Sequence, residues 1–351
     1  MRVKTILTSL LLIVALMLTA CANATSPSET GLKKYEAEFL GLFDTLTNIV
    51  GYADNKESFE AEVQKIKADL EVYHQLYDIY NTYPGLTNMK DINDRAGQGP
   101  IQVDVKIIEL LKFCQHAYDL TGGKVNVAMG SVLKIWHDYR EEGINDPSAA
   151  RVPSLQILQE ASQHTDFTDL VIDEANQTVE LRDPDMRLDV GAVAKGYATE
   201  QVTQAAIKRG ADHLLLSVGG NVRAIGFRND NAEPWRVGIE NPDDQIEDYL
   251  TIVKVSDLSV VTSGVYERYY EVNGKSYHHI IDPDTLFPEN RYLSVSIITH
   301  DSGLADILST ALFNMSLDEG KRLIESLGQT EALWCMPDGT LQESSGFAKY
   351  H

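Results

Sequence analysis

The residues best suited to chemistry stand in a glycine-framed turn that opens a helix, Asp189–Gly196. Glycine lets backbone N–H groups approach an anion closely, and the N–H groups of a helix start have no intrahelical partner. The turn therefore suits a phosphate, with Lys195 beside it and Asp189 accepting from a base or a ribose. An ordinary helix start with a surface lysine explains the same residues, so the turn alone leaves both interpretations open.

Two common nucleotide motifs do not describe this turn. Gly191 and Gly196 have the glycine spacing of a P-loop, but Lys195 precedes the second glycine and Tyr197 follows it. A Walker A motif needs Lys and then Ser or Thr at those places, and no G-x-G-x-x-G sequence is present. P-loop and Rossmann sites are therefore excluded for this turn. A second glycine turn, Gly219-Gly220-Asn221, follows the next expected strand.

Asp306 and Thr310 are spaced i, i+4 on an expected helix, so they lie one turn apart on one face. Carboxylate and hydroxyl oxygens suit a hard cation such as Mg²⁺, which keeps several waters and bridges to phosphate. The alternative is that both residues simply lie on the wet side of the helix.

A third group combines hydroxyls with histidine. Thr262, Ser263 and Gly264 end an expected strand and offer hydroxyls and bare N–H groups to an anion. His279 stands three residues before an Asp-Pro turn that begins at Asp282, and it is a candidate general base. A β-hairpin with a polar turn is the alternative.

The elements that must position these residues are mixed helices and strands without regular βα alternation, which favours an α+β fold. Helical patterns are expected at residues 32–39, 57–80, 103–118, 133–140, 154–162 and 317–327. Two further helices are expected, one between the turn at Gly196 and the strand at 213–218 and one that starts near Asp301 or Ser302. Strands are expected at residues 43–50, 170–173, 178–182, 213–218, 235–239, 250–256, 259–262, 266–272, 276–281, 292–299, 331–336 and 346–350, with residues 125–127 extended. Residues 81–99 are expected to form a loop, and the linker 145–153 is the best candidate for a domain boundary.

In this order, these stretches resemble the ApbE family of flavin transferases over roughly residues 40–340. The matching segments are Asp189–Gly196, Gly219–Asn221, Thr262–Arg268, His279–Pro283 and Ala305–Phe313, with Phe43–Thr45 and Ile92–Asn93 at the family's N-terminal strand and Asn-bearing loop. The resemblance implies one large mixed domain of the ApbE or T-fold-like type, residues 33–351, with an FAD site between sheet and helices.

The resemblance also implies the activity. The protein would transfer FMN from its substrate FAD to a threonine hydroxyl of acceptor proteins in extracytoplasmic electron-transfer systems, forming a phosphoester and releasing AMP. Asp306, Thr310 and the carbonyl of Ala192 would hold Mg²⁺. His279 would act as base or orienting group, helped by Asp282. The residues expected to contact FAD are Phe43, Tyr80, Asn93, Val125, Asn126, Val127, Asp189, Lys195, Gly219, Gly220, Thr262, Ser263, Gly264 and Ile280.

Two other functions compete with this one. A metal-dependent FAD pyrophosphatase would share the metal site and use water as acceptor. A non-catalytic, lipid-anchored flavin-binding protein would need only the cavity.

One residue departs from the family pattern. Leu286 stands where the family has glycine, so the local loop is expected to differ in shape.

The N-terminus resembles a bacterial lipoprotein signal. Arg2 and Lys4 precede an apolar run, and Cys21 follows a run of small residues. Residues 1–20 would be removed, Cys21 would be lipidated, and residues 21–32 would form a flexible tether to the cell membrane, outside the cytoplasm.

The mature chain is strongly acidic. The full chain has a net charge of −22, and removal of residues 1–20 takes away two of its basic residues. This balance argues against nucleic acid as a partner. Cys114 and Cys335 could pair or remain free thiols, and no Cys/His spacing indicates zinc.

Overall fold

The computed structural model describes residues 31–242 and 248–351. The expected signal peptide, Cys21 and most of the tether lie outside these residues. Within them, no helix has the length and apolar character needed to cross a membrane.

The main feature of the fold is an eight-stranded sheet in which every neighbouring pair is antiparallel. In spatial order its strands are β1 (Lys33–Leu42), β2 (Thr45–Ala53), β6 (Leu214–Val218), β7 (Asn221–Ile225), β10 (Ser259–Gly264), β13 (Ser294–Thr299), β14 (Glu331–Cys335) and β15 (Leu341–Glu343). The smaller sheets are formed by β3 (Ile101–Gln102), β5 (Thr178–Leu181) and β4 (Leu170–Asp173), by β8 (Trp235–Glu240) and β9 (Tyr249–Val255), and by β11 (Tyr269–Val272) and β12 (Lys275–His278).

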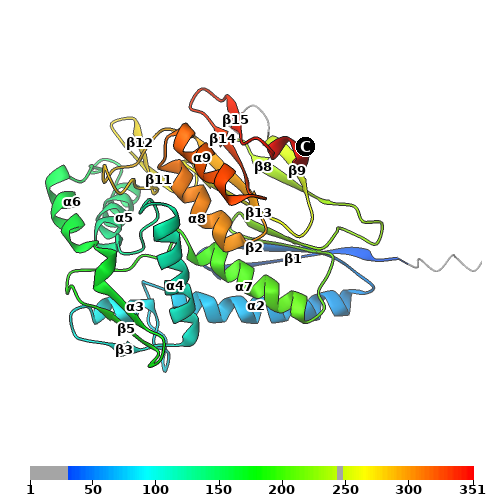
Figure 1. The fold of residues 1–351 in the computed structure, drawn as a ribbon, viewed down its shortest axis with the longest axis horizontal. Coiled ribbons are helices and arrows are strands. Elements are labelled where there is room, and N and C mark those ends of the chain that lie inside the picture. The colour runs from blue at the N-terminus through cyan, green and yellow to red at the C-terminus, as the bar shows by residue number, and fades with distance from the viewer. Residues whose placement is uncertain (1–30, 243–247) are drawn as a thin grey trace, which may run out of the picture.

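Helices cover one face of the main sheet, and α2 and α7 lie alongside each other below β1 and β2 in Figure 1. The helices are α2 (Lys56–Tyr77), α3 (Met89–Asp94), α4 (Val105–Leu120), α5 (Gly130–Asn145), α6 (Leu155–Ala161), α7 (Ala194–Lys208), α8 (Ser302–Phe313) and α9 (Leu317–Leu327). Short 3-10 helices span Ser162–His164, Phe167–Asp169 and Phe347–Tyr350.

Three groups of buried side chains hold these layers together. The largest fills the space between the main sheet and its helices, with Ile49, Leu70 and Leu308 among its members. A second lies on the opposite face of the sheet, under the β8–β9 hairpin. A third joins α5, α6 and the β11–β12 hairpin around Trp136 and Leu286. Burial of both faces explains why every residue of β13 and β14 is buried.

The mixed α+β class is confirmed, and four local expectations are wrong. Residues 33–42 form β1, not a helical lead-in, because Tyr35, Ala37 and Phe39 alternate with exposed residues. The expected loop 81–99 contains α3, which begins with a capping box at Asn88 and Asp91. Residues 125–127 form a turn, and the end of the chain forms a 3-10 helix in place of a strand.

The linker 145–153 does not separate two domains. Trp136 of α5 before it and Leu158 of α6 after it belong to the same buried cluster.

Cys114 and Cys335 are both free and buried, and burial raises the pKa of each thiol.

Candidate functional site

One cavity collects most of the residues singled out in the sequence. It lies where the main core meets the cluster around Trp136, and the end of β10 and the middle of α5 and of α8 contribute to its wall. The predicted residues that line it are Phe43, Tyr80, Val125, Asn126, Val127, Asp189, Ala192, Lys195, Gly219, Thr262, Ser263, Gly264, His279, Ile280, Asp306 and Thr310. Asn93, Gly220 and Asp282 do not line it.

The first turn of α7 packs directly against α8. The Gly196 N–H donates to Asp306 Oδ2 at 2.8 Å, and Lys195 Nζ lies 3.8 Å from Asp306 Oδ1. A Cβ on Gly196 would come within 2.4 Å of both Asp306 Cβ and the Ser302 carbonyl oxygen, so only glycine permits this approach. Asp306 is buried, which excludes a place on the wet side of the helix.

Three oxygen donors at this junction suit a hard cation. The Gly196 N–H, in the first turn of α7, is satisfied by Asp306, and Ala192 precedes the N-cap Val193, so its carbonyl lies outside the hydrogen bonds of the helix. Thr310 follows Asp306 by one turn, and its hydroxyl makes no hydrogen bond with the described residues. A carboxylate, a hydroxyl and a carbonyl are the donors that Mg²⁺ accepts. These residues therefore fit the ion.

The β6–β7 turn also reaches the cavity through a glycine. Gly219 has φ +53°, and a Cβ there would lie 2.5 Å from Thr45 Oγ1. Gly219 and Thr45 both line the cavity, whereas Gly220 completes the two-residue turn away from it. The second expected contact of this turn is therefore absent.

The hydroxyls of β10 are directed to protein partners. Thr262 Oγ1 lies 2.7 Å from Ser296 Oγ. Ser263 Oγ lies 2.8 Å from Ser309 Oγ, which in turn donates to the Asp306 carbonyl. Ser263 therefore donates to Ser309 and ties β10 to α8. Both residues line the cavity, but their hydroxyls are already engaged, which the sequence did not indicate.

The two adjacent histidines have different roles. His278 Nε2 lies 2.7 Å from the Glu289 carbonyl and its Nδ1 accepts the Ile280 N–H, so both ring nitrogens are occupied. His279 Nδ1 lies 3.3 Å from the Arg268 carbonyl. Because a carbonyl can only accept, Nδ1 carries the proton and Nε2 is left as a free acceptor.

The environment of His279 keeps its imidazole neutral. Burial, followed by the positive charge of Arg268, lowers its pKa to about 3. A neutral imidazole with a free Nε2 can accept a proton, although a pKa this far below neutral makes it a weak base.

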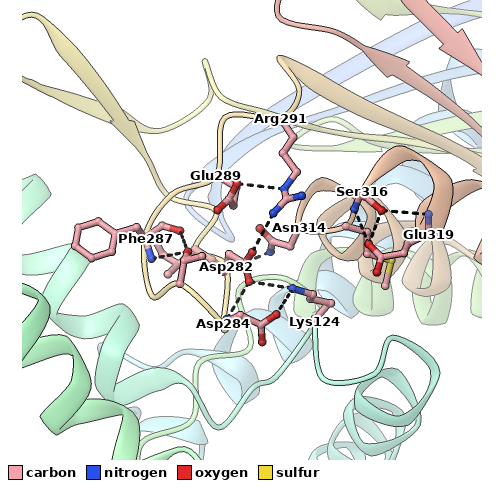
Figure 2. Close-up of polar contacts among 12 residues, drawn as sticks. Lys124, Asp282, Asp284, Phe287, Glu289, Arg291, Asn314, Ser316 and Glu319 are labelled. Atoms are coloured by element: carbon pink, nitrogen blue, oxygen red, sulfur yellow. Dashed lines mark hydrogen bonds and ion pairs between the residues drawn. The ribbon is translucent and has the colours of Figure 1, made fainter.

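Asp282 does not contact His279. Its carboxylate is buried and accepts from Lys124 Nζ at 3.1 Å and from the Asp284 N–H at 2.9 Å. Figure 2 shows Asp282 at the centre of this network, with Arg291 4.0 Å away on the other side. The carboxylate therefore holds the loop after β12 to Lys124, and its expected help to His279 has no direct contact behind it and stays a prediction.

Asn93 does not line the cavity either. It is buried, its Nδ2 donates to the Leu188 carbonyl at 2.9 Å, and its Oδ1 accepts the Leu188 N–H at 2.7 Å. Its amide therefore pairs with the backbone of Leu188, as a neighbouring strand would, and fixes the segment that leads to Asp189.

Burial raises the pKa of Asp189, and a hydrogen bond from the Gly191 N–H partly opposes this effect.

The loop of Leu286 keeps the backbone that glycine would permit. Leu286 has φ +62°, its side chain is buried, and its carbonyl accepts from Trp136 Nε1 at 2.9 Å. The expected change in loop shape is therefore not seen at this residue.

Four cationic side chains line the cavity of this acidic protein: Lys124, Arg140, Lys195 and Arg268. Of these four, the sequence patterns predict only Lys195. Arg268 stands inside a recognised motif, but Arg140 and Lys124 come from the second half of α5 and from the loop after α4, where no local pattern marks them. Carboxylates line the cavity as well (Asp44, Asp78, Asp189, Glu267 and Asp306), so the cations offer local positive charge to an anionic group such as a pyrophosphate, within a lining of mixed charge.

Comparisons with known proteins agree with this site. A model of the ApbE family matches residues 43–334. The FAD:protein FMN transferase of Treponema pallidum is 34% identical over 269 residues, 73% of this chain and 72% of the relative. That of Klebsiella pneumoniae is 30% identical over 249 residues, 71% of this chain and 74% of the relative. The crystal structure of the ApbE protein from Thermotoga maritima superposes with a TM-score of 0.79 at 27% identity, covering 91% of this chain and 99% of that one.

Proposed function

The chain belongs to the ApbE family and transfers FMN from FAD to proteins, and we propose that the acceptor group is a threonine hydroxyl and that Mg²⁺ assists the transfer. The observation that carries this proposal is the composition of one cavity. Cationic side chains, a set of hard oxygen donors and a neutral imidazole with a free Nε2 line the same space.

Phosphoryl-type transfer depends on positioning and on neutralisation of charge. Lys124, Arg140, Lys195 and Arg268 supply positive charge for the FAD pyrophosphate. Asp306, Thr310 and the Ala192 carbonyl would hold Mg²⁺, which supplies further charge neutralisation when it is bound. Asp189 would accept from the flavin or the adenosine.

His279 would take the proton of the acceptor threonine at Nε2. The threonine oxygen then forms a bond to the phosphorus of the FMN moiety, and the bond from that phosphorus to the bridging oxygen breaks. AMP leaves with that oxygen, and the product is a phosphoester between FMN and threonine. The transfer needs no oxidant or reductant, because the flavin ring takes no part in the bonds that form and break.

The metal assignment predicts a specific loss in the Asp306→Ala variant. The protein would be incubated with FAD, Mg²⁺ and a threonine-bearing acceptor protein, and the acceptor examined by intact mass. We expect the wild type to add one FMN to the acceptor and to release AMP, and the variant to lose at least 100-fold in rate, since the charge-neutralising ligand is gone. Circular dichroism would establish that the variant is folded.

The same assay distinguishes the competing functions. FMN and AMP in solution with an unmodified acceptor would identify a pyrophosphatase and contradict the transferase. Tight FAD retention without turnover, unaffected by a chelator, would identify a binding protein. Full activity of the Asp306→Ala variant would contradict the metal assignment but not the transfer.

We further propose that the protein is a lipoprotein held at the outer side of the cell membrane through Cys21. The support is the order of a basic start, an apolar run and small residues before this cysteine. Cys21→Ser is expected to move the protein from the membrane fraction to the soluble fraction, measured by blotting both fractions after expression. A variant that stays in the membrane fraction would contradict lipidation at this residue.

A further inference from the structure

The turn between β1 and β2 is strained where it meets the cavity. Phe43 and Asp44 both have φ +53°, and both line the cavity. The left-handed region costs roughly 1–2 kcal/mol for a residue with a side chain, and bulky residues are rare in it. A two-residue hairpin of this kind usually contains Asn and Gly. Such a turn persists only where its surroundings hold it in place.

His74, in the last turn of α2, holds this turn. The Phe43 N–H donates to His74 Nδ1 at 3.2 Å, and the two rings meet edge to face with centroids 5.6 Å apart. Because Nδ1 accepts, the proton of the neutral imidazole is on Nε2. Nε2 lies 3.4 Å from the Tyr83 hydroxyl, so the imidazole donates in that direction.

The chain of donors continues to a carboxylate. The Tyr83 hydroxyl donates to Asp78 Oδ2 at 2.9 Å. Asp78 is buried, which favours its neutral form, but hydrogen bonds from Asn81 and Tyr80 outweigh burial and lower its pKa. Every donor therefore points the same way, from the Phe43 amide to an ionised Asp78.

Asp78 also fixes the segment that carries Tyr80. Its Oδ1 accepts the Tyr80 N–H at 2.7 Å and the Asn81 N–H at 3.0 Å. The Tyr80 ring lines the cavity and lies 5.3 Å from the ring of His137, measured between centroids. Two aromatic residues of the cavity, Phe43 and Tyr80, thus depend on one hydrogen-bonded chain.

We propose that His74 is a positioning residue for the FAD site, acting on Phe43 directly and on Tyr80 through Tyr83 and Asp78. This inference rests on the proposed function for the identity of the ligand. His74 would act through Nδ1, which accepts the Phe43 N–H. This hydrogen bond would hold Phe43 and Asp44 in a left-handed backbone conformation that residues with side chains disfavour. Its loss would weaken FAD binding more than it slows the chemical step, because the turn supplies neither the expected metal ligands nor the expected base.

The test compares two substitutions of similar size, His74→Leu and His74→Asn. The Asn amide oxygen can replace Nδ1 as the acceptor for the Phe43 N–H, and Leu cannot. FAD dissociation constants would be measured by flavin fluorescence, and kcat and KM for FAD by the transfer assay. We expect His74→Leu to raise the dissociation constant and KM about tenfold with kcat within about threefold, and His74→Asn to restore binding to within about threefold.

Hydrogen exchange at the Phe43 amide reports on the turn without any ligand. Exchange should be slow in the wild type and in His74→Asn, and fast in His74→Leu. Wild-type FAD affinity in His74→Leu, or equal losses in both variants with folded spectra, would overturn the positioning role. If the wild type binds no FAD, the proposed function fails and the role in the FAD site fails with it, while the exchange pattern still decides whether His74 holds the turn.

Discussion

The protonation state of His279 sets what this residue can do in the cavity. Its Nδ1–H is fixed on the Arg268 carbonyl, and burial next to Arg268 lowers its pKa to about 3. The neutral form therefore prevails in the folded protein at pH values well above 3. As pH falls below 6.5, the ordinary value, an unfolded chain takes up a proton that the folded chain resists. This histidine therefore contributes stability above pH 6.5 that declines as pH falls toward 3.

We predict that His279 does not titrate between pH 8 and about pH 5 in the folded protein. The measurement is a proton NMR titration of the histidine ring signals, with the His279 signal assigned by its absence in His279→Gln. A flat chemical shift over this range is the expected result. An inflection near pH 6.5 in the assigned signal would show that the imidazole is solvated and that burial does not keep it neutral.

At the scale of the element, the loop after β12 holds a leucine in a backbone conformation that suits glycine. Leu286 has φ +62°, and its side chain packs in the cluster around Trp136. Packing and backbone preference therefore oppose each other at one residue. Truncating a buried leucine costs roughly 2–5 kcal/mol, whereas glycine removes roughly 1–2 kcal/mol of backbone strain that alanine keeps.

Both Leu286→Ala and Leu286→Gly should destabilise the protein, and the glycine variant should be the more stable by about 1 kcal/mol. The measurement is the free energy of unfolding in urea. Leu110, buried in α4, provides the matched control, because there the alanine variant should be the more stable by about 1 kcal/mol. The same order of stability at both positions would show that the backbone at Leu286 carries no strain.

The sequence predicts an element well where neighbouring residues mark it, and poorly where contacts with distant segments decide it. The bounds of α9 were predicted because Ser316 and Glu319 form a capping box and the apolar stripe is clear. Residues of the site that stand in contiguous motifs, such as Asp189 and Asp306, were also found. His74, Lys124 and Arg140 were missed, because their contacts lie with segments far away in sequence. Asn93 was misplaced because a buried amide bonded to backbone looks the same in sequence as one that faces a ligand.

At the scale of the whole molecule, the cavity joins two parts of the core. Ala192, Asp306 and Thr310 belong to the junction of α7 and α8, next to the main sheet, whereas Trp136 and Ile281 belong to the cluster formed with the β11–β12 hairpin. A ligand in the cavity contacts both parts. Its binding free energy then adds to the stability of the folded chain.

FAD and Mg²⁺ together should raise the melting temperature by more than the sum of their separate effects. Mg²⁺ and the FAD pyrophosphate carry opposite charges and would bind in the same cavity. Each ligand should therefore bind more tightly when the other is present. At about 100 times its dissociation constant a ligand adds roughly 2.7 kcal/mol, which corresponds to a few degrees for a domain of this size. Differential scanning calorimetry with FAD, Mg²⁺ and both ligands measures the effect. The Asp306→Ala variant should keep the shift from FAD alone and lose the additional shift from Mg²⁺, because the donor set at α8 is incomplete. An additional Mg²⁺ shift of the same size in that variant would place the cation elsewhere in the molecule.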